Sequence, residues 1–107
     1  MSRNEATKAV NRYIAQLKKA NYPFTEVYLF GSFARGTMHR DSDIDIAVVS
    51  PEVEKDSFEG KQKLWRFKRN ADIRIEPHGF SPKDFEEEWR PMVHEIKTTG
   101  IRVYPKA

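Results

Sequence analysis

The chain has 107 residues, 38% hydrophobic and 33% charged, which is enough for one domain over residues 1–107 with a single modest core and too apolar for a disordered segment. The absence of cysteine excludes disulfides, thiolate metal sites and a cysteine nucleophile, and the net charge of +3 is too small to indicate nucleic-acid binding unless it is clustered. No apolar run reaches the about 18 residues of a membrane span and the first residues are polar, so we expect a cytoplasmic protein with no membrane partner.

The first predicted element is an amphipathic helix over residues 4–20, where apolar residues recur every three or four positions. Pro23 marks its end, because the residue before a proline is pushed out of the α region. Residues 25–30 then form the first predicted strand. We expect the helix to pack on the sheet and to keep its charged residues in solvent. Its apolar stripe consists of Ala6, Ala9, Val10, Tyr13, Ile14, Leu17 and Ala20.

The segment after this strand carries the strongest chemical signal. Gly31 and Ser32 form a turn, which a short helix, a polar loop and a second strand over residues 44–49 follow. Asp43 and Asp45 open that strand, so both carboxylates point to one face, roughly 6–7 Å apart along the chain. Beyond Asp45 the strand is apolar on both faces, which predicts that the sheet is covered on both sides or runs through the middle of the fold.

Two carboxylates in one small space require a cation. Like charges about 4 Å apart repel by roughly 4 kcal/mol at an effective dielectric near 20, and a hard divalent ion removes that repulsion. Proteins hold Mg²⁺ with one or two carboxylates plus substrate phosphates, so a phosphate-binding element should lie nearby. Gly31 lets the backbone turn sharply, Ser32 adds a hydroxyl donor and Arg35 adds positive charge. Taken alone, a Gly-Ser pair is most often only a turn. An Asp-x-Asp sequence at the start of a strand is more often a solvated edge than a metal site.

A basic segment lies in the middle of the chain. Residues 52–60 are polar and predict a loop, and residues 61–69 then combine five basic residues with three apolar ones. We expect a short helix that packs Leu64 and Trp65 inward, with its Lys and Arg residues in water. Basic residues interleaved with aromatics also occur on nucleic-acid-binding surfaces, which is the alternative interpretation.

The last third of the chain predicts a strand, a helix and a final strand. Residues 71–76 alternate, with Ile73 and Ile75 on one face and charged residues on the other. Ser81 followed by proline is typical of a helix start. A short edge strand over residues 101–104 ends the predicted fold.

Three parts of this pattern together resemble a known family. The Gly-Ser pair at 31–32, ten intervening residues and Asp-Ile-Asp at 43–45, flanked by the apolar runs 27–30 and 46–49, resemble the signature of the DNA polymerase β-like nucleotidyltransferase superfamily. The size of the chain is similar to that of its minimal nucleotidyltransferases, many of which are antitoxin partners of HEPN-domain proteins. The resemblance implies an α/β (α+β) fold, a nucleotidyltransferase palm with a mixed sheet of about four strands flanked by helices.

The resemblance also implies a chemistry. A third carboxylate would come from Asp72 at the start of the third strand, with Glu76 as the alternative should the register differ. Two Mg²⁺ ions would assist transfer of AMP from ATP to a hydroxyl on a partner macromolecule such as a HEPN-type toxin. The site residues so implied are Asp43, Asp45 and Asp72 for catalysis and the metal, and Gly31, Ser32 and Arg35 for the nucleotide phosphates.

Two other functions stay open. In the first, the chain is an antitoxin-like binding module that neutralises a partner by occlusion and whose nucleotide site is vestigial. In the second, it is a nucleotidyltransferase that acts on nucleic acid, with the basic segment 61–69 or a partner gripping the strand. Trp89 and Met92, or the basic segment, are the candidate contacts to a partner, since aromatic residues, Met and Arg are enriched at interface cores.

Overall fold

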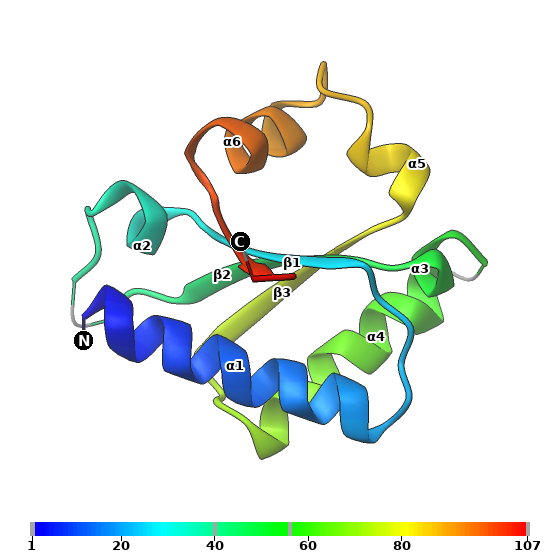
Figure 1. Cartoon of the computed structure of the whole chain (residues 1–107), viewed down its shortest axis with the longest axis horizontal. Helices are drawn as coiled ribbons and strands as arrows, with labels where there is room; N and C mark the ends of the chain where they lie inside the picture. The colour runs from blue at the N-terminus through cyan, green and yellow to red at the C-terminus, as the bar shows by residue number, and fades with distance from the viewer. Residues whose placement is uncertain (1, 40, 56, 107) are drawn as a thin grey trace.

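A four-stranded sheet in the order β3-β2-β1-β4 forms the centre of the chain (Figure 1). The computed structural model describes residues 2–39, 41–55 and 57–106. β1 (Glu26–Phe30) pairs antiparallel with β2 (Ile44–Val49) and β4 (Ile101–Tyr104), whereas β2 and β3 (Ile75–Phe80) run parallel. This mixed sheet confirms the predicted fold class. Within the described ranges, no helix has the length and apolar character needed to cross a membrane.

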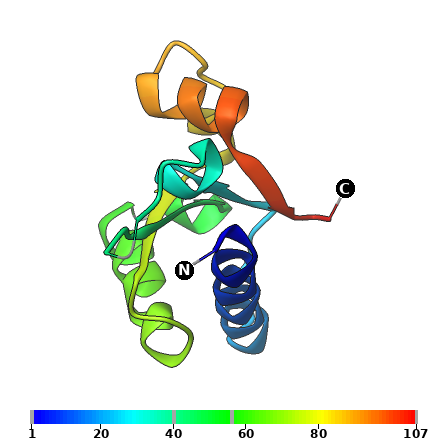
Figure 2. The same cartoon turned by 90° about the vertical axis from the view of Figure 1, so that its left-hand side faces the viewer.

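Helices cover both faces of the sheet, as Figure 2 shows. Ile44, Ile46 and Val48 of β2 pack into a core with α1 and α4, while Ala47 and Val49 pack on the other face with α5 and α6. The prediction that β2 is covered on both sides is therefore confirmed. The helical elements are α1 (Arg3–Lys19), α2 (Ser32–Arg35), α3 (Pro51–Lys55), α4 (Ser57–Phe67), the 3-10 turn η1 (Lys68–Asn70), α5 (Pro82–Phe85) and α6 (Pro91–Thr99).

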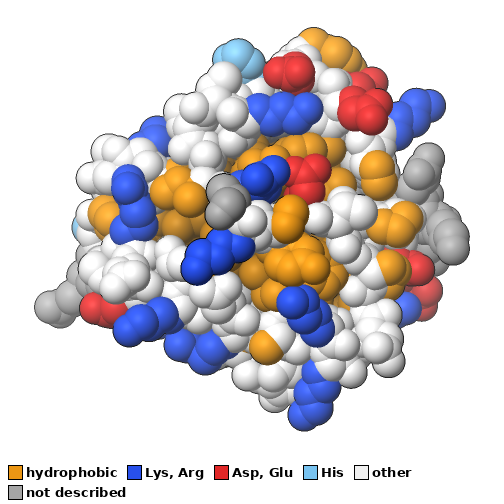
Figure 3. Space-filling model, viewed as in Figure 1, with side chains coloured by type: hydrophobic (Ala, Val, Ile, Leu, Met, Phe, Trp, Pro, Cys, Tyr) orange, Lys and Arg blue, Asp and Glu red, His pale blue; other side chains and the backbone are white. Residues whose placement is uncertain are grey.

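The amphipathic pattern of α1 has the predicted outcome. All of its predicted apolar stripe is buried except Ala20, which lies at the exposed C-cap. Lys and Arg side chains lie along the solvent face of this helix (Figure 3). At its start the Ser2 hydroxyl accepts a hydrogen bond from the N–H of Glu5 at 3.1 Å, which satisfies one free donor of the first turn. Tyr13 donates to the carbonyl of Leu64 at 2.7 Å, so α1 is joined directly to α4.

The predicted loop over 52–60 is wrong, because α3 and the start of α4 occupy that segment. The helical pattern was hard to see from the sequence, since the buried residues among the described side chains of α3 and α4 are Val53 and Leu64, which lie far apart along the chain. Leu64 is buried as predicted. Trp65 is not, because 45% of its surface is exposed, so the inward packing predicted for it is also wrong.

The third strand begins later than predicted. A turn in which the Ile75 N–H donates to the Asp72 carbonyl at 3.1 Å precedes β3, and Ile73 is 75% exposed instead of sharing a buried face with Ile75. The strand continues through Pro77, which the sequence analysis left outside it. A proline is tolerated there because β3 is an edge strand, with β2 as its only neighbour in the sheet order.

Candidate active site

The turn after β1 packs directly against a carboxylate. Gly31 has φ +74° and ψ −146°, a conformation that residues with a Cβ atom rarely adopt. A Cβ atom at this position would lie 2.5 Å from Oδ2 of Asp45. Glycine is therefore required both by the backbone angle and by the close approach, and the Gly31-Ser32 turn and Asp45 form one compact unit.

The parallel register of β2 and β3 brings a second carboxylate to the same place. Asp45 is the register partner of Glu76, and Ala47 is the partner of His78. Neighbouring residues in register point to the same face of a sheet, and residues two apart on one strand do so as well. Asp45, Glu76 and His78 consequently converge on the face that α5 and α6 cover.

His78 completes this cluster, and the sequence analysis missed it. Its Nε2 atom lies 3.5 Å from Oδ1 of Asp45 and 3.9 Å from Oε1 of Glu76, and its ring centroid lies 5.3 Å from that of Phe30. The signal was present in the sequence as Glu-Pro-His, because the spacing of two places Glu76 and His78 on one face of a strand. The predicted strand covers residues 71–76, so His78 falls outside it.

The electrostatics of Glu76 show how closely the carboxylates gather. The pKa of Glu76 is raised, first because burial disfavours its charged form, then because the Asp45 charge repels it and because it is hydrogen-bonded to Asp43. Asp43 itself is exposed at the start of β2. Asp43, Asp45 and Glu76 therefore form one acidic cluster in which like charges are only partly compensated, by His78.

Asp72 does not join this cluster, which corrects its predicted placement. Its carboxylate accepts hydrogen bonds from the Arg74 backbone N–H at 3.0 Å and from Arg74 Nε at 2.9 Å, and Arg12 Nη2 of α1 lies 3.3 Å away. These partners lower the pKa of Asp72 to about 2, with the Arg74 side chain as the largest cause. Asp72 thus anchors the turn before β3 to α1, and the carboxylate beside Asp45 is Glu76, the alternative that the sequence left open.

The remaining predicted site residues lie on α2, next to the cluster. Ser32 is half-buried at the first position of this helix. Arg35 is exposed, and its Nη1 atom contacts Oε2 of Glu95 in α6 at 2.6 Å. Arg3 of α1 donates to the carbonyls of Phe33 and Ala34 at 3.1 and 2.9 Å, which satisfies two of the free acceptors of the short helix. The position of α2 is therefore fixed from both sides.

The donor atoms of the cluster fit a divalent cation. One ligand atom from each of Asp45, Glu76 and His78 lies within 4.8 Å of the others. The Nε2 atom of His78 is buried and has no hydrogen-bond partner among the described residues, although a buried polar atom usually has one. Two carboxylate oxygens and an imidazole nitrogen are ligands that Mg²⁺, Mn²⁺ and related ions accept, with the nitrogen favouring the transition metals.

The chain is similar in sequence and fold to known proteins. A segment of 38 residues is 53% identical to "Protein adenylyltransferase MntA" of Shewanella oneidensis. This match covers 35% of the chain and 27% of that protein. A crystal structure of a toxin-antitoxin with AMP-PNP superposes with a TM-score of 0.58 at 26% identity, covering 90% of this chain and 73% of the other. A mutant of the toxin-antitoxin MntA-HpeT superposes at 0.60 with 21% identity and the same coverage, which supports the fold alone. Because the family model of the nucleotidyltransferase domain matches residues 10–96, this chain belongs to the nucleotidyltransferase domain family.

Proposed function

We propose that the chain is a metal-dependent adenylyltransferase that moves AMP from ATP to a hydroxyl group on a partner protein, a HEPN-type toxin. One observation carries this proposal. The register of β2 and β3 gathers Asp45, Glu76 and His78, and Asp45 lies against the Gly31 turn, so the residues proposed to hold a cation adjoin the turn proposed to hold the phosphates. Nucleotidyl transfer needs these two elements side by side.

The acidic cluster has a defined role in this proposal. Asp43, Asp45 and Glu76 hold divalent cations, with Glu76 taking the place that the sequence analysis gave to Asp72. When bound, Mg²⁺ neutralises the charge that develops on the α-phosphate and on the leaving pyrophosphate. The acceptor oxygen forms a bond to the α-phosphorus while the bond to the β-phosphate oxygen breaks. The acceptor proton passes to one of these carboxylates.

The residues of α2 orient the triphosphate. Gly31 and Ser32 present backbone N–H groups and a hydroxyl at the edge of the cluster, where the β and γ phosphates would lie. Arg35 must exchange Glu95 for a phosphate to take part. That exchange is inexpensive, because both side chains of the ion pair are well exposed and such pairs contribute about 0–1 kcal/mol.

Similarity to solved structures supports the choice of ATP and of a protein acceptor. The neighbour at 26% identity was solved with AMP-PNP, an ATP analogue, and it is a toxin-antitoxin complex. The relative from Shewanella oneidensis is a protein adenylyltransferase, although the matched segment spans only 27% of its length. The pairing with a HEPN protein follows from the resemblance to minimal nucleotidyltransferases.

Labelling with radioactive ATP tests the proposal. The purified chain is incubated with α-labelled ATP, Mg²⁺ and candidate HEPN-domain partner proteins, and label is then followed on each protein. We expect label on the partner, abolished by Asp45→Asn and unchanged by Glu86→Gln, an exposed carboxylate at the C-cap of α5. Label on added RNA with none on protein would instead favour the nucleic-acid function, and binding of the partner with no label anywhere would favour the occlusion function.

A further inference from the structure

The positive charge of the chain is concentrated in one segment. Residues 57–70 contain five basic residues and one acidic residue, a net charge of +4 against +3 for the whole chain, so the rest of the chain carries a net −1. In the parts of the chain that the structure describes, none of these five cations takes part in an ion pair, whereas Arg12, Arg35, Arg74, Arg90 and Lys97 all do. Positive charge without an internal partner favours a negatively charged ligand. The five cations are Lys61, Lys63, Arg66, Lys68 and Arg69.

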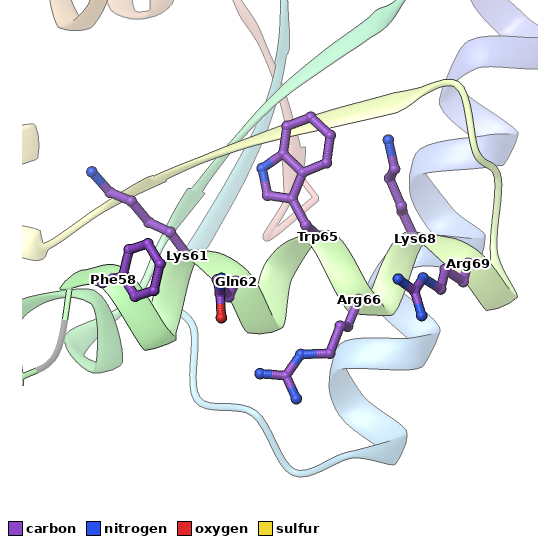
Figure 4. Close-up of a pocket in the computed structure, with 7 residues that line it drawn as sticks. All are labelled: Phe58, Lys61, Gln62, Trp65, Arg66, Lys68 and Arg69. Carbon is purple, nitrogen blue, oxygen red and sulfur yellow. The ribbon is translucent and has the colours of Figure 1, made fainter.

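Four of these cations line a groove together with exposed aromatic residues. The groove has a volume of about 680 Å³ and runs along α4 and η1. Lys61, Trp65 and Lys68 project to the same side of α4, as Figure 4 shows, because positions three and four apart share a helix face. Phe58 in the same groove is 71% exposed. Large apolar side chains exposed among charged ones mark interaction sites more often than plain surface.

This groove continues toward the acidic cluster. Lys61 and Trp65 also line a second groove, of about 280 Å³, whose other walls include His78 and Met92. Gly79 of β3 allows α4 to approach this strand closely, because a Cβ atom on Gly79 would lie 2.9 Å from Cδ1 of Leu64. α4 therefore packs tightly on the strand that carries Glu76 and His78. The two joined grooves, here called the basic-aromatic track, lead from η1 to the candidate active site.

We propose that the basic-aromatic track binds an acidic, aromatic-containing segment of the acceptor protein and leads its hydroxyl side chain to the Asp45 and Glu76 carboxylates. The transfer of AMP to the bound segment rests on the proposed function. The binding of that segment to the track does not depend on it. Charge complementarity would steer the segment to the outer groove, the one along α4 and η1 that four basic side chains line. Apolar anchors would then fill the space beside Trp65 and Met92, the residue types that dominate interface energetics.

Two observations favour a protein segment over a nucleic acid strand. The Lys68 ammonium lies 4.2 Å from the centroid of the Trp65 ring, so it occupies a ring face that a base would need for stacking. The inner groove is lined by Pro77, Phe80 and Met92, and Lys61 is the single Lys or Arg among its described lining residues, so a phosphate backbone entering it would lose most of its counter-charges. The track is therefore basic at its outer end and mainly apolar at its inner end. A peptide with acidic side chains at one end and apolar side chains at the other matches this arrangement.

Direct binding measurements test the track. Fluorescence anisotropy is recorded with a labelled glutamate-tyrosine copolymer, with polyglutamate and with oligouridylate as probes, in the absence of ATP and divalent ions. The double charge reversal Lys61→Glu with Lys68→Glu should weaken copolymer binding about tenfold or more. The matched control, Lys8→Glu with Lys106→Glu, changes the net charge equally at exposed positions away from α4 and should leave the affinity unchanged. Lys61→Gln with Lys68→Gln replaces the reversal if that variant fails to fold.

Each outcome decides between the alternatives. A weaker affinity of Trp65→Ala for the copolymer, with unchanged affinity for polyglutamate, would support an aromatic anchor beside the charge. Equal losses in the track and control variants would overturn the proposal, as would tighter binding of oligouridylate through the same residues. Copolymer binding by a chain that labels no acceptor would refute the proposed transfer and keep the track, while labelling without copolymer binding would refute the track alone.

Discussion

The backbone of Gly31 lies so close to the Asp45 carboxylate that a Cβ atom on Gly31 would stand 2.5 Å from Oδ2. Gly31→Ala should therefore displace Asp45 or the turn. At φ +74° the alanine would also add backbone strain of about 1–3 kcal/mol. We expect a lower free energy of unfolding in urea and loss of the increase in melting temperature that Mn²⁺ or Mg²⁺ gives the wild-type chain.

Gly36→Ala is the matched control for this change. Gly36 has a similar φ of +78°, but apart from its two chain neighbours no atom of the described residues lies within 4 Å of the position that its Cβ atom would take. The variant should lose about 1–2 kcal/mol of stability from the left-handed conformation alone and keep the response to divalent ions. If both variants lose that response equally, the contact between Gly31 and Asp45 has no special role in the site.

Glu76→Gln separates metal binding from folding. Without a divalent ion, this change removes a carboxylate that Asp45 and Asp43 repel, so the melting temperature at pH 7 should rise. With Mg²⁺ and ATP, adenylyl transfer should fall about 10²-fold or more, the scale of losing one charge-stabilising group. Glu86→Gln should change neither quantity. Full activity of Glu76→Gln would exclude this residue from the metal site.

Asp72 should influence stability in acid. Its pKa is about 2 in the folded chain against an ordinary value of 3.8, so the ionised carboxylate favours the folded state. That contribution is complete above about pH 4 and disappears as the pH falls toward 2. Asp72→Asn should flatten the loss of stability over this interval, measured by urea unfolding, and should leave metal binding intact. Asp41→Asn, at an exposed loop position, serves as the control.

The contrast between Asp72 and Glu76 shows how far the sequence alone could lead. Local patterns predicted α1, β1, β2 and the Gly31 turn, because those segments have clear apolar periods and a turn glycine. They also placed Asp43 and Asp45 at the start of β2. The third carboxylate depends on a pairing between strands that lie about 30 residues apart, and nothing local encodes that register. Alternation in residues 71–76 put Asp72 and Glu76 on one face, and the family resemblance favoured Asp72. The pairing of Ile44 with Ile75 places Glu76, and not Asp72, beside Asp45.

A second limit concerns side chains whose environment comes from elsewhere in the chain. Trp65 looked like a core residue, but Leu64 is the one that is buried, α1 holds α4 through the hydrogen bond from Tyr13 to the Leu64 carbonyl, and Trp65 is 45% exposed. His78 became part of the site only because β3 continues through Pro77, a residue that normally argues against a strand. Both cases are tertiary effects that override local propensity.

His78 should determine which divalent ion the site prefers. If its Nε2 atom is a ligand, His78→Gln should weaken Mn²⁺ and Co²⁺ binding about 10–100-fold and Mg²⁺ binding much less, because imidazole favours transition metals. Isothermal titration calorimetry measures both affinities. The Co²⁺ absorption spectrum of the wild-type chain should show a nitrogen ligand that the variant lacks. His94→Gln, on the exposed face of α6, should behave like the wild type. An unchanged metal preference in His78→Gln would mean that His78 only positions Asp45.

The ion pair between Arg35 and Glu95 should compete with nucleotide. The 2.6 Å contact joins exposed side chains, so breaking it should change the free energy of unfolding by less than about 1 kcal/mol. Arg35→Gln should weaken binding of AMP-PNP with Mg²⁺ about tenfold or more, the scale of a hydrogen bond to a charged group, whereas Glu95→Gln should leave that binding equal or tighter because it frees Arg35. Titration calorimetry compares the two variants directly, since they break the same ion pair from opposite ends. Equal weakening in both would show that the pair acts by holding α2 against α6, and unchanged affinity in Arg35→Gln would remove Arg35 from the phosphate site.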